Sequence, residues 1–397
     1  MAGPAAASAP NPAAQDVGRI PQTTVGMPPG GPPVRYATRS QQLAYSVTGQ
    51  AFGANITQPL VAVAGFLTAL IVKVQAVGGT STAAVVATAD APWSAIGTLT
   101  LRDASGQPIY PAVDGFGLFL INLYSGMAGN GGAQDPRVLP SFSAVVLTSG
   151  AGAGNFTMKL WLPLEANSSG YCALPGDNSA ELPKLFITMG TSAAVYSTAP
   201  STLPTLTVTV EEEFLAVPNN YPNWVPFDAG ASHQWMLTVS GNNPPNAAAQ
   251  RVQDQGVGQF VMTKIYTLRD STNARIDSFP SSDLTWWIDN YPYLFELSDD
   301  RFDKMAKEFF VGTSVFQARP AGVIAYTRRS SLSTTLGEVT LSDDLEQALV
   351  TTGSTKVEVG GTWGTISNQP ASLTAYTGMV FPGPTGWPYG SQVFGLS

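Results

Sequence analysis

Few residues of this chain could carry out chemistry. The 397-residue sequence contains one histidine, His233, and one cysteine, Cys172. A Ser-His-Asp triad would depend on His233 alone, and a lone histidine just before the apolar run 235–239 is more typical of a structural hydrogen-bonding group. Cys172 has no basic neighbour in sequence that would activate its thiol, and a single cysteine can form no intramolecular disulfide. The pair also cannot supply a Cys/His zinc cluster.

Carboxylates provide the other candidate chemistry. Three groups stand out, namely Glu211 to Glu213, Asp299-Asp300 and Asp343-Asp344. Paired acids catalyse glycoside hydrolysis on β scaffolds, but the two aspartate pairs are better explained as charges at helix N-termini. Consecutive side chains alternate along a strand, so Glu211 and Glu213 would share one face without Glu212. We therefore predict no catalytic residue, no metal site and no cofactor, and the chain is not expected to be an enzyme.

Composition narrows the class of protein further. Charged residues make up only 12% of the chain, whereas it contains 40 glycines and 31 prolines, a balance that argues against long helical bundles. The net charge of −8 makes direct nucleic-acid binding a poor prediction. The most apolar stretch, Leu60 to Val77, is interrupted by Lys73 and Gln75, so no membrane span is expected. These features favour a large all-β protein.

Strand-like alternation recurs along the sequence. Apolar residues alternate with polar ones at 72–76, 156–162 and 205–211, which is the period of a sheet with one buried face. Clusters of Gly, Pro, Asn and Ser separate these runs, as in antiparallel sandwiches. Helices are expected only at 114–124, at 299–310 and from residue 342. Further short strands are expected at 185–189, 235–239, 260–268, 323–327 and 355–359.

An internal repeat indicates two similar halves. Thr100 to Asp103 reads TLRD and returns as Thr267 to Asp270, an offset of 267 − 100 = 167 residues, which fits one jelly roll with long loops. The fold class predicted is all-β, with two tandem eight-stranded jelly rolls and a few short helices. The predicted segments are an extended Ala/Pro-rich N-terminal arm (1–36), jelly roll 1 (37–217), jelly roll 2 (218–366) and an uncharged aromatic C-terminal tail (367–397).

Aromatic residues are the candidate interface or packing anchors. No charged residue follows Glu358, yet the end of the chain is rich in aromatic side chains, which indicates docking on its own subunit or on a neighbour. The adjacent pair Trp286-Trp287 could stack on sugars, but packing is the simpler interpretation. The predicted anchors are Trp286, Trp287, Tyr376, Phe381, Trp387, Tyr389 and Phe394.

Several segments resemble one known family in order and spacing. They are 65–74, 157–164, 185–189, 211–214, 319–323 and 357–361, and together they span roughly residues 40–365. In this order they resemble the tectivirus-type major capsid proteins of tailless bacteriophages with an internal membrane. The resemblance implies a double jelly roll, a homotrimeric pseudo-hexameric capsomer and an icosahedral virion shell. The arm and the tail depart from the family pattern.

The resemblance and the composition lead to one functional hypothesis and one alternative. The hypothesis is a major capsid protein of the virion, assembled in the host cytoplasm, whose partners are neighbouring capsomers together with penton and minor capsid proteins. The N-terminal arm would lie near the internal viral membrane, and an acidic shell separated from the genome by a membrane needs no basic arm. The alternative is a carbohydrate-active β-sandwich protein, either a glycosidase or a lectin-like receptor-binding spike.

Overall fold

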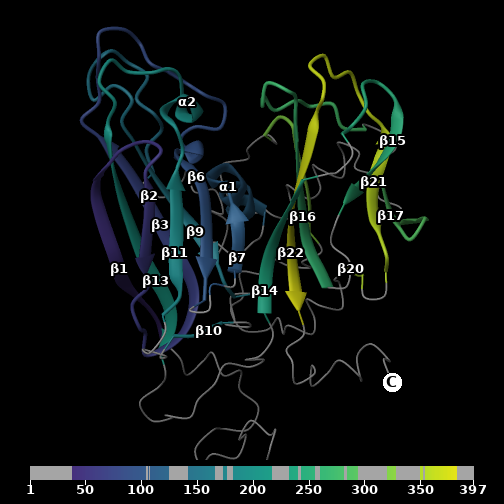
Figure 1. Ribbon diagram of the computed structural model, residues 1–397, viewed down its shortest axis with the longest axis horizontal. Helices are drawn as coiled ribbons and strands as arrows, with labels where there is room; N and C mark the ends of the chain where they lie inside the picture. Colours follow the sequence, from purple (N-terminus) through teal and green to yellow (C-terminus); the bar gives the residue numbers. More distant parts are fainter. Residues whose placement is uncertain are drawn as a thin grey trace, which may run out of the picture.

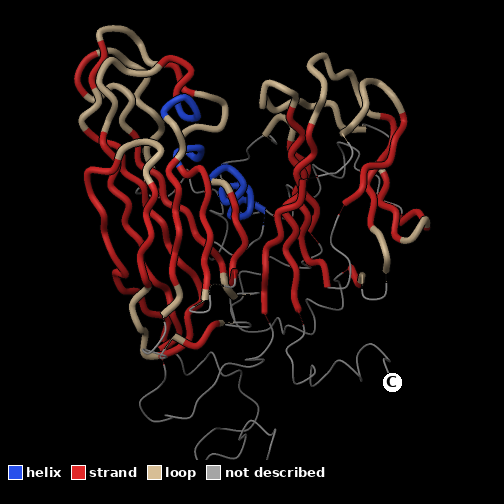
Figure 2. Tube along the Cα trace, viewed as in Figure 1, coloured by secondary structure: helices blue, strands red, loops and turns tan. Residues whose placement is uncertain are grey.

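Two β-sandwiches stand side by side in the chain, with their strands running in similar directions (Figures 1 and 2). Loops gather at the ends of both sandwiches, and the longer sheets belong to the N-terminal one. This architecture is seen in a computed structural model that describes residues 38–103, 106, 108–124, 142–165, 173–176, 182–216, 232–239, 243–254, 260–280, 284–293, 320–327, 349–351 and 354–381.

The first sandwich consists of two antiparallel sheets. One has the order β1 (Thr38–Gln50), β13 (Thr205–Ala216), β3 (Gly65–Val77) and β9 (Phe156–Pro163), with β10 (Leu174–Pro175) also on β3. The other has the order β2 (Asn55–Pro59), β11 (Lys184–Met189), β6 (Ile96–Arg102) and β7 (Pro108–Val113). Short pairs outside these sheets are β4 (Thr80–Ser81) with β8 (Gly150–Ala151) and β5 (Val86–Ala87) with β12 (Tyr196–Thr198).

The second sandwich is built in the same way. Its first sheet has the order β14 (Ser232–Val239), β22 (Ser372–Phe381), β16 (Phe260–Arg269) and β19 (Val323–Thr327), with β20 (Leu349–Val350) also on β16. Its second sheet has the order β15 (Ala249–Asp254), β21 (Val357–Thr362), β17 (Thr285–Ile288) and β18 (Tyr291–Tyr293).

The two sandwiches share one topology. When the eight main strands of each are numbered along the chain, both have sheets of order 1-8-3-6 and 2-7-4-5. This is the strand order of a jelly roll, in which every neighbour is antiparallel and the chain alternates between two facing sheets. The predicted fold class, an all-β chain with two eight-stranded jelly rolls and few helices, is confirmed.

The sequence repeat that suggested this duplication does not mark equivalent positions. Thr100 to Arg102 are the last residues of β6, the fourth main strand of its roll, whereas Thr267 to Arg269 are the last residues of β16, the third main strand of the other. The interpretation of TLRD as a trace of duplication is therefore wrong. Since a jelly-roll strand requires alternating burial and no particular residues, equivalent strands such as β3 and β16 can share their position without sharing a motif.

The predicted start of the tail at residue 367 also needs correction. Residues 372–381 form β22, which pairs with β14 on one side and β16 on the other, so this part belongs to the second sandwich. The strand lacks a clear alternation because Tyr376, Thr377 and Met379 are all buried, although neighbouring side chains point to opposite faces. The predicted arm, the boundary at 217/218 and residues 382–397 lie outside the described residues.

Period-two burial accounts for the first core. On β9, Phe156, Met158, Leu160 and Leu162 are buried, while the intervening side chains are only half-buried.

The predicted helix at 114–124 is confirmed as α1 (Gly115–Tyr124). Two shorter elements accompany it, the 3-10 turn η3 (Trp93–Ala95) and α2 (Ser192–Val195). The helices expected at 299–310 and from 342 lie outside the described residues.

Candidate functional site

The most elaborate arrangement of side chains lies where the two sandwiches meet, around α1 (Figure 1). Asp114 begins this helix: its carbonyl accepts a hydrogen bond from the Leu118 amide at 2.9 Å, and its Oδ1 accepts one from the Gly117 amide at 3.1 Å. Phe116, Leu118 and Phe119 are buried on different sides of the helix. A helix that is apolar all round must be covered on all sides, and α1 is covered by both sandwiches.

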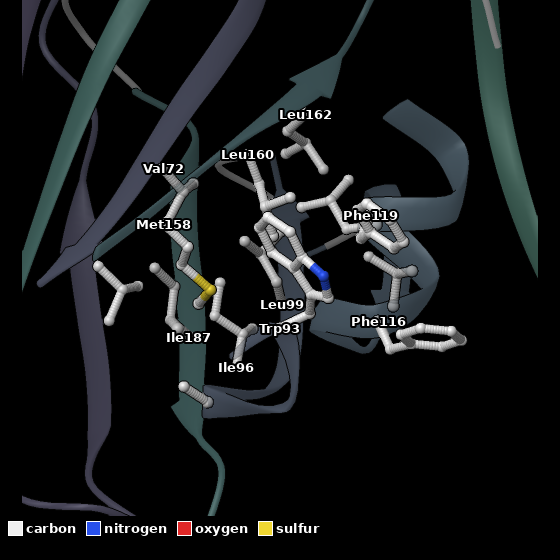
Figure 3. Packing of buried hydrophobic residues seen from close by; sticks show 14 of the residues in the cluster. Val72, Trp93, Ile96, Leu99, Phe116, Phe119, Met158, Leu160, Leu162 and Ile187 are labelled. Carbon is white, nitrogen blue, oxygen red and sulfur yellow. The ribbon is translucent and has the colours of Figure 1, made fainter. Parts of the chain in front are cut away.

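Stacked aromatic rings fix α1 against the first sandwich. The ring of Trp93 lies parallel to that of Phe119, with centroids 4.6 Å apart, and the Phe142 ring packs 5.3 Å from the Trp93 ring. Figure 3 shows Trp93 between α1 and the side chains of β6 and β9, among them Leu99 and Leu160. Offset stacking of this kind adds to the energy of apolar burial, so the helix is a rigid part of the first core.

The second sandwich presents an outer face to the same cluster. Ile265, Val323, Ala325 and Tyr376 belong to the apolar cluster of the first sandwich, whereas their strand neighbours point into the core of the second. The sheet β14-β22-β16-β19 is therefore buried on both faces where α1 covers it. Edge strand β7 of the first sandwich also runs beside β14 of the second.

Charged groups complete this junction. Asp90 of the first sandwich accepts from Arg269 Nη2 at Oδ2 and from Arg275 Nε at Oδ1, both at 2.6 Å. Arg275 also donates to the carbonyl oxygens of Ala89 at 3.1 Å and Ala321 at 2.6 Å. Both guanidinium groups lie over the ring of Phe116, Arg275 at 4.7 Å from its centroid and Arg269 at 5.5 Å.

A tyrosine and an aspartate form a second polar contact across the junction. The Tyr376 hydroxyl donates to Asp114 Oδ1 at 2.8 Å. Burial raises the pKa of the Asp114 carboxyl above its usual range, although the hydrogen bond from Tyr376 and the charge of Arg269 oppose this shift. Burial, followed by the charge of Asp114, raises the pKa of Tyr376. We call Asp90, Asp114, Phe116, Arg269, Arg275 and Tyr376 the inter-sandwich junction.

Several predicted anchors have a described environment. Trp286 is buried in the second core, and its ring centroid lies 6.2 Å from that of Tyr266. The guanidinium carbon of Arg251 lies over Trp287, 3.3 Å from the centroid of its ring. Tyr376 belongs to the inter-sandwich junction. Phe381 ends β22, and its side chain is not described. Trp387, Tyr389 and Phe394 lie outside the described residues, so their role as anchors stays a prediction.

The carboxylates of β13 serve structural contacts in the first sandwich. Glu213 accepts from Arg39 at 2.6 Å, and the same guanidinium binds Glu165 at 2.7 Å. Glu212 is fully buried, where it accepts from the Gln42 side chain at 2.7 Å and from the Val61 amide at 2.8 Å. Burial raises the pKa of Glu212. These acids are held by partners within the sandwich.

The structure describes little around the remaining candidates for chemistry, which are the histidine, the cysteine and the two aspartate pairs. His233 lies on β14 opposite Val380, and Cys172 and the aspartate pairs at 299–300 and 343–344 lie outside the described residues. Within the described ranges, no cluster of three or more His, Cys, Asp or Glu side chains could hold a metal ion. The described part of the chain also has no helix long and apolar enough to cross a bilayer.

The sequence analysis did not single out the polar residues of the junction. No motif or spacing in the sequence marks Asp90 or Arg275, and Arg269 stands out only as part of the TLRD repeat. One usable signal is the scarcity of charge: in a chain with 12% charged residues, the three basic or acidic residues at 269, 270 and 275 stand close together after an apolar strand. Their partner Asp90 is far away in sequence, so the pairing itself requires the fold.

The fold defines the chain as a double jelly roll, and the comparisons with solved structures agree. The MCP of Sulfolobus Turreted Icosahedral Virus (STIV) is 16% identical with a TM-score of 0.60, covering 90% of this chain and 100% of the STIV chain. The PBCV-1 protein VP54 is 13% identical with a TM-score of 0.59, and the match covers 87% of this chain and 94% of the VP54 chain. The Faustovirus major capsid protein is 7% identical with a TM-score of 0.50, covering 87% and 90%.

These structural neighbours are viral major capsid proteins of the double jelly-roll type. At such low identity the similarity lies in the fold, which extends over nearly the whole chain in each comparison. No protein-family model and no curated protein matches the chain. The fold expected from the resemblance in sequence order is therefore found in three dimensions.

Proposed function

We propose that this chain is a major capsid protein that assembles as a trimeric, pseudo-hexameric capsomer in an icosahedral virion shell. The observation that carries the proposal is the pairing of two jelly rolls with the same strand order, side by side in one chain. A threefold axis acting on such a pair places six similar sandwiches in a ring. A ring of six tiles a hexagonal lattice, although it contains only three chains.

The inter-sandwich junction supports this role because a lattice unit must keep its two halves in a fixed relation. Interfaces between independent domains are usually polar and allow relative motion. Here α1 and the outer face of the β16 sheet share one continuous apolar cluster, and two arginines bind Asp90 across it. The two sandwiches therefore form one rigid building block.

Exposed apolar side chains offer candidate contacts between subunits. Val77, Val86, Leu147 and Leu203 are 41–50% exposed, and all lie at the end of the first sandwich where the short strands β4, β5, β8 and β12 pair. Burying such side chains against a neighbouring copy would gain about 25 cal/mol for each Å² of apolar surface. This end of the first sandwich is the part we assign to contacts within the trimer or between capsomers.

The finer partners follow from the same proposal. The N-terminal arm would contact the internal membrane side of the shell, the aromatic end of the chain would link capsomers, and penton and minor capsid proteins would bind at the vertices. The protein would reside in the virion after assembly in the host cytoplasm. The glycosidase form of the carbohydrate-active alternative required convergent free carboxylates, whereas Glu165, Glu212 and Glu213 all have partners within the sandwich. We therefore propose no enzymatic activity.

Native mass spectrometry of the purified chain tests the capsomer. The expected particle has three times the chain mass of 41.5 kDa. A matched pair of variants, Val86→Asp at the exposed end and Lys184→Ala at an exposed position of β11, separates the proposed contacts from surface changes in general. We expect the first to weaken assembly and the second to leave it unchanged. A stable monomer at micromolar concentration would contradict the proposal.

A further inference from the structure

A fully buried lysine and aspartate lie in contact within the core of the second sandwich. Lys264 on β16 and Asp254 at the end of β15 form an ion pair between Nζ and Oδ2, with side-chain exposures of 0% and 1%. The Tyr266 hydroxyl donates to the same Oδ2 at 2.7 Å, and the ring of Trp286 lies 5.5 Å from Nζ. Isolated ionic groups are costly in such surroundings, since no water solvates them.

The hydrogen bonding of this aspartate is one-sided. Both donors reach Oδ2, while Oδ1 is buried and has no hydrogen-bond partner among the described residues. Buried carboxylates normally use both oxygens, because an unsatisfied buried acceptor destabilises the fold. The arrangement therefore concentrates both donors on Oδ2, the oxygen that lies against Nζ.

We propose that Lys264 and Asp254 form an intramolecular isopeptide bond. Proton transfer from Nζ to Oδ2, the oxygen that it contacts, gives a neutral amine and a neutral carboxyl group. The lone pair of Nζ attacks Cγ, and a new Nζ–Cγ bond forms. The Cγ–Oδ2 bond breaks, and Oδ2 leaves as water with the carboxyl proton and one amine proton. The condensation balances with no oxidant, cofactor or further reactant.

Tyr266 has a catalytic position in this step. Its hydroxyl donates to Oδ2, the oxygen that leaves, so its hydrogen bond stabilises the charge that develops there as the Cγ–Oδ2 bond breaks. Burial, followed by the charge of Asp254, raises the pKa of Tyr266, so the hydroxyl keeps its proton for this bond. The amide oxygen of the product would be Oδ1, and Oδ2 would be gone.

The bond would join the two sheets of the second sandwich covalently. Asp254 belongs to the sheet of β15 and β21, and Lys264 to the sheet of β16 and β22. With a single cysteine, the chain has no means of closing an intramolecular disulfide at this place. A covalent link across the core would restrict opening of the second sandwich, which contains fewer long strands than the first.

Mass spectrometry of the denatured full-length chain tests the bond directly. We expect an intact mass lower than the sequence mass by one water molecule. Trypsin should leave one uncut peptide of residues 252–269, because Lys264 is the only cleavage site between Arg251 and Arg269 and its amine would be acylated. Fragmentation should place the loss of water between Asp254 and Lys264. The full sequence mass, with cleavage after Lys264, would overturn the proposal.

Matched variants assign the chemistry. Lys264→Arg keeps a cation and a trypsin site but cannot form the amide under these conditions, so it should show the full sequence mass and a cut after residue 264. Tyr266→Phe should slow bond formation, so the uncrosslinked mass should persist in freshly made protein. If Lys264→Arg also lost one water, the loss would arise elsewhere and the assignment would be wrong. The wild-type result stands even if a variant fails to fold.

Discussion

Arg275 of the second sandwich donates from Nε to Oδ1 of Asp90 in the first sandwich at 2.6 Å, and the two side chains are only 11% and 16% exposed. Since Arg269 binds the other oxygen of the same carboxylate, two arginines share one aspartate at the point where the sandwiches meet. Removing a carboxylate that binds two cations in a poorly solvated place costs more folding free energy than removing one partner of a surface ion pair.

Replacing Asp90 should therefore destabilise the whole chain. In Asp90→Ala, Arg269 and Arg275 keep their charges in a poorly solvated place but lose the carboxylate that both bind, and we expect a loss of about 3 kcal/mol in the free energy of unfolding. Urea denaturation followed by tryptophan fluorescence measures this loss. Lys184→Ala, on the exposed surface, is the control and should change stability by less than about 0.5 kcal/mol. Equal stability of both variants would mean that the junction is not held by this cluster.

Gly117 should respond to substitution in the opposite direction to an ordinary helix glycine. Gly→Ala in an exposed helix usually stabilises by about 1 kcal/mol. A Cβ at Gly117, however, would meet the ring of Tyr376 and Oδ1 of Asp114, so we expect Gly117→Ala to destabilise the chain by ~1–3 kcal/mol. Thermal unfolding measures the effect.

A double-mutant cycle identifies the cause at Gly117. Removing the ring in Tyr376→Ala should make the additional Gly117→Ala change less harmful, because the ring that the new Cβ would approach most closely is then absent. If the two effects simply add, the close approach of α1 to β22 does not determine the result.

Asp114 should make stability depend on pH. Its pKa is raised in the folded state, chiefly by burial, so the folded chain holds this proton more tightly than the unfolded chain. Its stabilising contribution is full below the usual value of 3.8 and is lost as pH rises through the raised value. Asp114→Asn removes the titration and can keep both hydrogen bonds, because Gly117 and Tyr376 donate to the same Oδ1.

Urea unfolding of wild type and Asp114→Asn over a pH series tests this contribution. We expect the variant to gain stability relative to wild type as pH rises above 3.8. Glu212, whose pKa is raised in the same direction, remains in both proteins and does not affect the difference. Parallel pH profiles would show that Asp114 does not titrate differently in the folded chain.

Strands with alternating burial were predictable from sequence, whereas β22 was not. The alternation of β9 and β13 revealed their place in the first sandwich, and the uniformly apolar α1 indicated a covered helix. On β22, however, Tyr376 packs on the first sandwich while Ala375 and Met379 pack in the second. Apolar and polar residues therefore do not alternate along β22, and the sequence pattern places this segment in the predicted tail.

The functional residues were harder to predict for the same physical reason. A pairing such as Asp90 with Arg275 joins residues that no local pattern relates, because it exists only once two finished sandwiches meet. The TLRD repeat failed because four matching residues carry no information on which strand of a jelly roll they occupy. The resemblance in segment order succeeded because it used the order of several segments and the total length that they span.

Electron cryomicroscopy of the assembled protein tests the central claim most directly. The account predicts shells of capsomers with hexagonal outline, in which each chain contributes two upright sandwiches and a threefold axis relates three chains. The inter-sandwich junction, with Arg275 on Asp90, should occur three times within each capsomer. Particles built from monomers or true hexamers, or a capsomer in which the two jelly rolls of one chain do not lie side by side, would contradict it.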